Sequence, residues 1–268
     1  MRADTSNDFC DRRSRDHGGA RAGARGSGCF VIFGIVLTAG RSSRLGFPKA
    51  LAQLDGETFV ARAVRALREG GADPICVVVA PPHGSAIEAA LEGVTFAHNP
   101  EPERGMLSSL QVGLAVALRH ADLDAVLFSL VDHPRVRPET IRRLAALPLS
   151  GARRPVYSGR GGHPVAISAA LARELASAPP TATIRELLVG QFADVIVDDP
   201  GVVEDIDTPR DLEDSGGSRN YNANRTYSDY DDFDEATAPK FEPPKSEPMS
   251  EPVGESISKP IGEKQEAE

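Results

Sequence analysis

The stretch VIFGIVLTAGRSSRLGFPKALAQLDG, residues 31–56, joins an apolar run at 31–38 to a loop that contains arginines, serines and a lysine. Short apolar runs rich in β-branched residues are typical of a strand buried on both faces. A glycine directly after the run lets the backbone approach a ligand closely, and the basic side chains supply positive charge. The segment therefore predicts a buried first strand followed by an anion-binding loop.

Two common phosphate-binding motifs do not fit this loop. The dinucleotide fingerprint G-x-G-x-x-G requires a glycine at position 42, where the chain has Ser42. The P-loop pattern, counted from Gly40, also fails, because its second glycine and its lysine fall on other residue types. Gly40, Arg44 and Lys49 nevertheless suit a nucleoside triphosphate, through close backbone approach and charge. The alternative is an exposed basic loop without a ligand.

The rest of the central region alternates between strand and helix patterns. Apolar or β-branched runs predict further strands at 74–80, 94–98, 125–131, 163–168 and 194–198. Apolar residues at helical spacing predict helices over 57–70, 108–121 and 138–147. This alternation predicts an α/β fold, a three-layer α/β/α sandwich around a mostly parallel, Rossmann-like sheet. Ligands of such sheets bind beyond the carboxyl ends of the strands, where loops converge.

The two ends of the chain differ in composition from its middle. Residues 1–30 have few apolar residues, and residues 214–268 are rich in Ser, Glu and Pro. Such stretches cannot bury enough apolar surface to offset the entropy of ordering, so both are predicted to be disordered. Residues 214–268 carry thirteen Asp or Glu and six Lys or Arg, which accounts for seven of the nine net negative charges of the chain. Residues 31–213 remain as one α/β domain.

Cysteine usage and hydropathy bear on the location of the chain. Cys10, Cys29 and Cys76 lie far apart without metal-ligand spacing, so neither a zinc site nor a disulfide framework is predicted, and a reducing cytoplasm is the simplest location. A pair of arginines before the first apolar run resembles an export signal, but that run ends in a charged loop without a small-residue cleavage site. No segment has the length of a membrane span, and no basic stripe indicates nucleic acid.

Five motifs follow one another along residues 32–213. They are LTAGRSSRLGFPKALAQLDG (37–56), NPEPERGMLSSLQVGL (99–114), LVDHP (130–134), GRGGHPVAIS (159–168) and VEDIDTPRDLE (203–213). Together they resemble the molybdenum cofactor nucleotidyltransferase-like family, whose signature is L-x-A-G-x-S-x-R-[ML]-G-x-P-K. The resemblance implies a sheet of the nucleotide-diphospho-sugar transferase type and a nucleotidyltransferase activity.

The resemblance also implies a reaction. A phosphate oxygen of molybdenum-molybdopterin would attack the α-phosphate of CTP, and pyrophosphate would leave. Ala39 points to cytosine, because family members with L-x-A-G use cytosine and those with L-x-G-G use guanine. An acceptor phosphate is already an anion at neutral pH, so positioning and charge neutralisation would supply most of the rate. The chain departs from the family at Thr38, Val131 and His133, where alanine, glycine and glutamine are usual.

Three aspartates are candidates for binding Mg²⁺. Asp132 follows the apolar run at 125–131, and a carboxylate at this edge of the sheet suits an ion that takes oxygen ligands and bridges to phosphates. The alternative is a turn-forming aspartate. Asp205 and Asp207 are two residues apart on an extended segment, and periodicity does not choose between them. The resemblance favours Asp207, whose alternative role is to cap the helix that follows.

The remaining site residues are assigned by the resemblance. Nucleotide is expected on Leu37, Thr38, Ala39, Gly40, Arg44, Lys49, Ser108 and Ser109. Lys49, Arg44 and Asp132 are expected to carry catalysis, with the two cations screening the triphosphate. Gly162 and His163 are expected beside the acceptor, and a structural turn is their alternative.

Rival functions stay open. One rival is a relative that uses GTP, or a sugar or polyol phosphate as acceptor, and another is a nucleotide-binding regulatory module without catalysis. An NAD-binding oxidoreductase is disfavoured by Ser42. The acidic tail, residues 214–268, is a candidate for docking on an apo-molybdoenzyme or its insertion chaperone, and a solubilising terminus is the alternative.

Overall fold

A central sheet organises the computed structural model, which describes residues 30–39, 45 and 47–219. The sheet has eight strands in the order β10-β7-β9-β6-β1-β4-β5, and β8 pairs with β7. The strands are β1 (Val31–Leu37), β4 (Ile75–Val79), β5 (Thr95–His98), β6 (Leu123–Leu130), β7 (Ala152–Tyr157), β8 (Arg160–Gly161), β9 (Val165–Ser168) and β10 (Phe192–Ile196). β1 pairs in parallel with β4 and β6, and β9 runs antiparallel to both β6 and β7. The predicted mostly parallel sheet is therefore confirmed.

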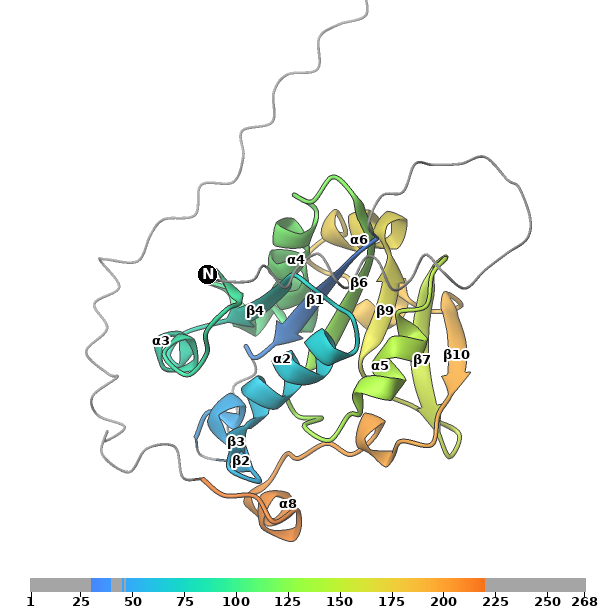
Figure 1. The fold of residues 1–268 in the computed structure, drawn as a ribbon. Coiled ribbons are helices and arrows are strands. Elements are labelled where there is room, and N and C mark those ends of the chain that lie inside the picture. Colours follow the sequence, from blue (N-terminus) through green and yellow to red (C-terminus); the bar gives the residue numbers. More distant parts are fainter. Residues whose placement is uncertain (1–29, 40–44, 46, 220–268) are drawn as a thin grey trace, which may run out of the picture. The chain divides into compact units, whose positions relative to one another are not determined.

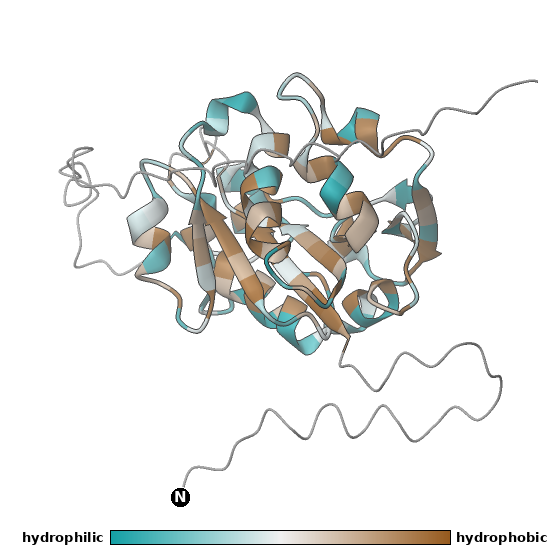
Figure 2. Ribbon diagram, turned by 90° about the horizontal axis from the view of Figure 1, so that it is seen from above, coloured by the Kyte–Doolittle hydropathy of each residue, from teal (hydrophilic) through white to brown (hydrophobic). Residues whose placement is uncertain are grey.

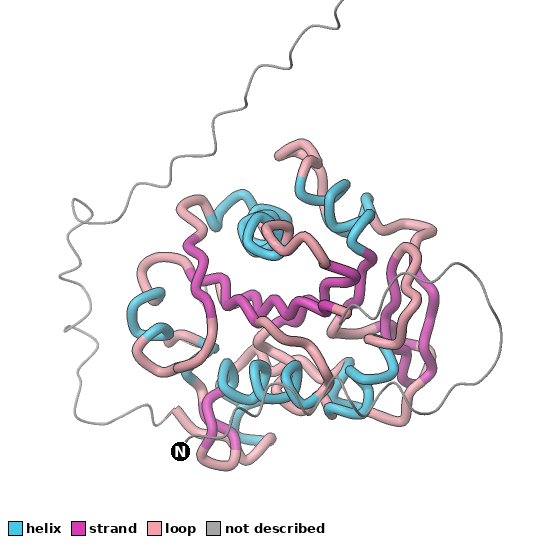
Figure 3. Tube along the Cα trace, turned by 45° about the horizontal axis from the view of Figure 1, so that its top comes forward, coloured by secondary structure: helices cyan, strands magenta, loops and turns pink. Residues whose placement is uncertain are grey.

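Helices cover both faces of this sheet (Figures 1 and 3). They are α2 (Phe59–Glu69), α3 (Gly84–Glu88), α4 (Met106–Ala117), α5 (Pro138–Leu144), α6 (Ala169–Ala176), α7 (Ile184–Leu187) and α8 (Pro209–Asp214). Short 3-10 turns and a hairpin complete the described elements: η1 (Lys49–Leu51), η2 (Pro102–Arg104), η3 (Pro200–Val202), β2 (Gln53–Leu54) and β3 (Glu57–Thr58). Helices α2 and α5 pack on one face, and α4 and α6 pack on the other, which is the predicted three-layer sandwich.

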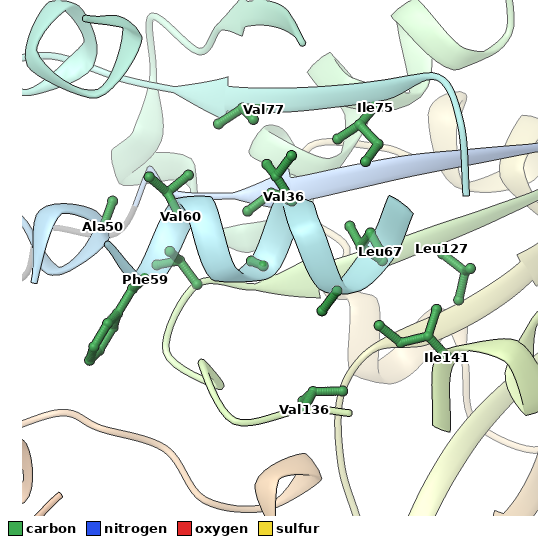
Figure 4. Close-up of a cluster of buried hydrophobic side chains, with 14 of the residues drawn as sticks. Val36, Ala50, Phe59, Val60, Leu67, Ile75, Val77, Leu127, Val136 and Ile141 are labelled. Atoms are coloured by element: carbon green, nitrogen blue, oxygen red, sulfur yellow. The ribbon is translucent and has the colours of Figure 1, made fainter. Parts of the chain in front are cut away.

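Alternate residues of the buried strands belong to two separate hydrophobic cores, one on each face of the sheet. Val36 and Leu127 face α2 and α5, where they join Leu67 and Ile141 (Figure 4). Ile35, the sequence neighbour of Val36, faces α4 on the other side of the sheet. Because both faces of the sheet are covered, its strands are apolar on both sides, which Figure 2 shows as mainly brown strands among helices that carry both teal and brown residues.

The sequence predicted the parallel strands better than the elements that follow β6. β7 was missed because its sequence, ARRPVY, places two arginines and a proline in a strand, and proline is disfavoured there. The strand predicted at 163–168 begins only at Val165, and the one at 194–198 lies at Phe192–Ile196. Helix α6 was also missed; Ser168 caps it by accepting a hydrogen bond from the Leu171 N–H (3.2 Å).

The ordered chain continues past residue 213, the predicted end of the domain. Helix α8 continues to Asp214, and Ser218 then forms a two-way backbone bridge with Gln53, with N···O distances of 2.9 and 2.8 Å. The chain therefore stays attached to the domain at least as far as Ser218. Residues 1–29 and 220–268, which hold most of the two segments predicted to be disordered, lie outside the described residues.

In the part of the chain that the structure describes, no helix combines the length and the apolar composition needed to cross a membrane.

Packing of α2 on α5 generates a first prediction. A Cβ at Gly70, the residue that caps the carboxyl end of α2, would lie 2.2 Å from Cγ2 of the buried Ile141, although the αR backbone at Gly70 tolerates any residue. We expect Gly70→Ala to lower the free energy of unfolding by about 2 kcal/mol through overpacking. Ile141→Gly removes both obstructing atoms, Cγ2 and the Cβ that would lie 2.5 Å away, so the double variant should lose less than the sum of the single losses, by about 1 kcal/mol or more. Urea denaturation of the four proteins measures this, and additive losses would contradict it.

Candidate active site

A lysine and two aspartates meet at the carboxyl edge of the sheet. Lys49 begins η1 after the first loop, Asp132 follows β6, and Asp207 precedes α8. The Lys49 Nζ lies 3.4 Å from Asp132 Oδ2 and also donates to Asp207 Oδ1. The three side chains are 13%, 23% and 25% exposed, so solvent screens their charges only partly. The structure thus brings together residues that are 83 and 158 positions apart.

Asp207, and not Asp205, lies beside Lys49. Asp205 is exposed, whereas the intervening Ile206 is buried and donates its N–H to the Asp132 carbonyl (3.0 Å). This bond ties the segment to the end of β6 and places Asp207 beside Lys49. Helix capping, the alternative role of Asp207, is carried out by Thr208 and Asp211, which form a capping box.

The carboxylate pair suits a divalent cation. Asp132 Oδ1 is buried and has no hydrogen-bond partner among the described residues. The Lys49 ammonium lies between the two carboxylates, which shows that this space accepts a cation. The described residues contain no group of three or more His, Cys, Asp or Glu arranged to hold a metal. Two carboxylates would supply part of an oxygen shell, and phosphate oxygens and water would complete it, as is usual for Mg²⁺.

His133 lies next to Asp132, and His163 lies against His133. The rings of His133 and His163 are 5.3 Å apart between centroids, and His133 Nε2 is 3.7 Å from Asp132 Oδ1. Each Nδ1 is buried without a hydrogen-bond partner in the described part of the chain. Burial, and next the nearby His133, lowers the pKa of His163 to about 3, so this ring is neutral at physiological pH. A neutral ring can accept or donate a hydrogen bond but cannot neutralise a phosphate.

The backbone around His163 is held by the segment that leads to α8. The His163 N–H donates to the Val202 carbonyl (2.9 Å), and the Gly162 N–H donates to the Pro155 carbonyl (2.9 Å). A Cβ at Gly162 would lie 1.9 Å from the Val202 carbonyl oxygen, so only glycine permits this approach. The close packing supports the structural alternative for Gly162.

The two serines predicted to bind nucleotide are hydrogen-bonded to Asn99, which was not among the predicted site residues. The Asn99 side-chain amide donates to the hydroxyls of Ser108 (3.0 Å) and Ser109 (2.9 Å), and all three residues are buried. Ser108 in turn donates to the Gly105 carbonyl at the start of α4 (2.8 Å). These bonds shape the loop that enters α4. The available signal was the position of Asn99 directly after a predicted strand.

The first loop is described only in part. The Thr38 hydroxyl donates to the Val78 carbonyl (2.7 Å) and is buried, so this side chain fastens the end of β1 to β4. Leu37 is buried at the end of β1, and Ala39 follows at the same edge, half-buried. Gly40 and Arg44, predicted to approach and screen phosphates, lie outside the described residues.

A cleft opens next to His163. It has a volume of about 770 Å³ and reaches from Gly162 and His163 to α7 and β10. Three arginines line it: Arg104, Arg154 and Arg185. Arg154 is paired with Asp194 at 2.7 Å and lies over the Phe192 ring, while Met106 and Val189 add exposed apolar surface. The cleft suits an anionic ligand with an apolar part, and His163 connects it, through His133, to the carboxylates.

Known proteins share this arrangement of elements. Residues 34–195 match the MobA-like NTP transferase domain, which covers more than half of the chain. The chain belongs to the MobA-like NTP transferase family. It is therefore a nucleotidyltransferase, which confirms the family and the enzyme class that the five motifs predicted.

Curated relatives of this MobA-like NTP transferase differ in the nucleotide that their names state. A molybdenum cofactor cytidylyltransferase of Escherichia coli (strain K12) is 26% identical over 186 residues, covering 66% of this chain and 92% of the relative. A probable molybdenum cofactor guanylyltransferase of Opitutus terrae is 34% identical over 89 residues, covering 33% of this chain and 44% of the relative.

A solved structure shares the fold of this MobA-like NTP transferase. The crystal structure of Rv0371c from Mycobacterium tuberculosis H37Rv has a TM-score of 0.61 at 29% identity, covering 70% of this chain and 98% of that chain. A complex of Rv0371c with manganese has a TM-score of 0.58 at 26% identity and covers 69% and 97%.

The environment of His163 predicts how stability depends on pH. Its folded pKa of about 3 lies below the unfolded value of 6.5, so the unfolded chain binds more protons between these values. This residue therefore contributes a loss of stability as pH falls from about 6.5 towards 3. We expect His163→Asn to flatten the decline in unfolding free energy between pH 6 and 4 by up to about 1.4 kcal/mol per pH unit. Urea denaturation at several pH values measures the slope, and equal slopes in the two proteins would disprove the prediction.

Proposed function

We propose that this MobA-like NTP transferase transfers CMP from CTP to the phosphate of molybdenum-molybdopterin and releases pyrophosphate. The observation that carries the proposal is the placement of Lys49 between Asp132 and Asp207 at the carboxyl edge of the sheet. Ala39 in the L-T-A-G motif supports cytosine, as does the Escherichia coli relative, a molybdenum cofactor cytidylyltransferase.

Positioning and charge carry the proposed reaction. The acceptor phosphate oxygen forms a bond to the α-phosphorus of CTP while the bond to the β-phosphate oxygen breaks, and pyrophosphate leaves with that electron pair. Lys49 moves its ammonium from the carboxylates to the triphosphate oxygens and offsets the charge that develops there. The acceptor is already an anion, so no protein base is required.

Asp132 and Asp207 would hold Mg²⁺, which when bound neutralises charge on the α-phosphate and the leaving pyrophosphate. Asp132 Oδ1, which is buried and has no hydrogen-bond partner in the described part of the chain, supports this role, because a desolvated carboxylate oxygen needs a partner. The manganese complex of Rv0371c supports a divalent cation in this fold.

The cleft beside His163 is the proposed acceptor site. Its three arginines suit a phosphorylated acceptor, and its apolar lining suits a ring system. His163 lines the cleft and its ring lies against His133, which is 3.7 Å from Asp132 Oδ1, so the neutral His163 ring would contact the acceptor on the side of the carboxylates. An apo-molybdoenzyme or its insertion chaperone is the proposed recipient of the product.

The second candidate is the same transfer from GTP, which the guanylyltransferase of Opitutus terrae favours. Incubation with molybdenum-molybdopterin, Mg²⁺ and each nucleotide distinguishes the two. We expect pyrophosphate release with CTP to exceed that with GTP by about tenfold or more. Ala39→Gly should shift the ratio towards GTP. A preference of the unaltered protein for GTP, or faster transfer to a sugar or polyol phosphate, would overturn the proposal.

Substitution of the aspartates tests the metal role. Asp132→Asn and Asp207→Asn should each lower kcat by about 10²–10³-fold, because each removes a charge that acts on the transition state. Asp205→Asn is the matched control, since Asp205 is exposed and two residues from Asp207, and it should stay within about twofold. Pyrophosphate release across a Mg²⁺ titration measures these effects, with circular dichroism to check folding. A large loss with Asp205→Asn and none with Asp207→Asn would exchange their roles, and equal losses would contradict the choice of Asp207 over Asp205.

A further inference from the structure

Asp199 is a buried carboxylate that the proposed chemistry does not use. It follows β10 at the start of η3 and is 2% exposed. Its Oδ2 accepts hydrogen bonds from the Arg137 N–H (3.0 Å) and the Thr140 hydroxyl (2.7 Å), and its Oδ1 accepts one from the Gly201 N–H (3.2 Å). A carboxylate so deeply buried is stable only when its oxygens are bonded in this way.

These bonds supply a helix cap from a distant part of the chain. Helix α5 begins after Arg137, whose own side chain makes no cap hydrogen bond. Asp199, 62 residues later, accepts the Arg137 N–H and the hydroxyl of Thr140 in the first turn. Its negative charge is also favourable at the amino end of a helix. Asp199 therefore joins the start of α5 to the start of η3.

From Asp199, the chain is attached to the active site at successive points. A Cβ at Gly201 would lie 2.5 Å from the Arg135 carbonyl, so the two backbones are in close contact. The Val202 carbonyl accepts the His163 N–H (2.9 Å), and the Ile206 N–H donates to the Asp132 carbonyl (3.0 Å). Residues 204–207 form neither helix nor strand, so these attachments determine where Asp207 lies.

We propose that Asp199 is a positioning residue for the active site: by fixing residues 199–203 to α5, it holds His163 and Asp207 in place relative to Asp132. The consequence for catalysis rests on the function proposed above. The positioning itself is a property of the fold and can be measured without any substrate.

Asp199→Asn tests the proposal, because it keeps the side-chain shape but presents an N–H₂ group to backbone or hydroxyl donors. Hydrogen exchange of the full-length protein reports on the attachments. We expect the amides of His163 and Ile206 to exchange about tenfold faster in the variant, since a lost cap increases local opening by roughly this factor. Unchanged exchange at both amides would overturn the proposal.

Ser168→Ala is the matched control. Ser168 is a buried cap of α6, but it lies opposite Ala125, near the amino end of β6 and away from the carboxyl edge that holds the site. It should lower the melting temperature without changing exchange at His163 or Ile206. Equal acceleration in both variants would reduce Asp199 to a general stabilising role. Should Asp199→Asn not fold, Thr140→Val removes one donor to the same carboxylate and should produce a smaller acceleration at the same amides, and its absence would also overturn the proposal.

An assay of nucleotidyl transfer distinguishes a failure of the positioning role from a failure of the proposed function. If the proposed function holds, Asp199→Asn should lower kcat and raise the Mg²⁺ concentration that gives half-maximal rate, about tenfold each, while Ser168→Ala changes neither. Normal kcat and Mg²⁺ dependence with faster exchange would overturn the catalytic consequence. No transfer by the unaltered protein, with exchange changed as expected, would refute the proposed function and leave the positioning role intact.

Discussion

The parallel pairing of β1 with β6 is the constraint on which the site depends. Its register places Leu37 opposite Leu130, so the loop after β1 and the loop that carries Asp132 leave the sheet side by side. β9 runs antiparallel to β6 and brings His163 to the same edge from the opposite chain direction. A shift of one residue would exchange the two buried faces of β1, so core packing determines the geometry of the site together with the fold.

The carboxylate cluster lowers the stability of the folded state. Asp132 and Asp207 place two negative charges in a partly desolvated region, where Lys49 interacts with both. The neighbouring His133 and His163 are held with polar atoms unpartnered in the described structure. Such groups lower stability, and in an enzyme they are retained where a ligand will complete them. A charged substrate and its cation would therefore find a site whose electrostatics already suit them.

Local patterns explain which elements could be predicted. β1, β4 and β6 are predominantly apolar runs, because helices cover both of their faces, and such runs are recognisable without any knowledge of partners. β7 carries Arg153, Arg154 and Pro155, whose places in the sheet are set by neighbours that the local sequence does not specify. Asn99 and Asp199 were missed for a similar reason. Each is an ordinary polar residue until its partners at Ser108 and Ser109, or at Arg137 and Thr140, are known.

The sequence by itself determined the parallel strands β1, β4, β5 and β6, the helices α2, α4 and α5, the family and the enzyme class, because apolar periodicity and short motifs are local properties. Tertiary structure alone decided which distant groups meet. It placed Asp207 rather than Asp205 beside Lys49, because the buried Ile206 is bonded to the end of β6. It also placed the Thr38 hydroxyl on β4 and the ring of His133 against His163. Contacts across many tens of residues depend on register and packing, which no local pattern encodes.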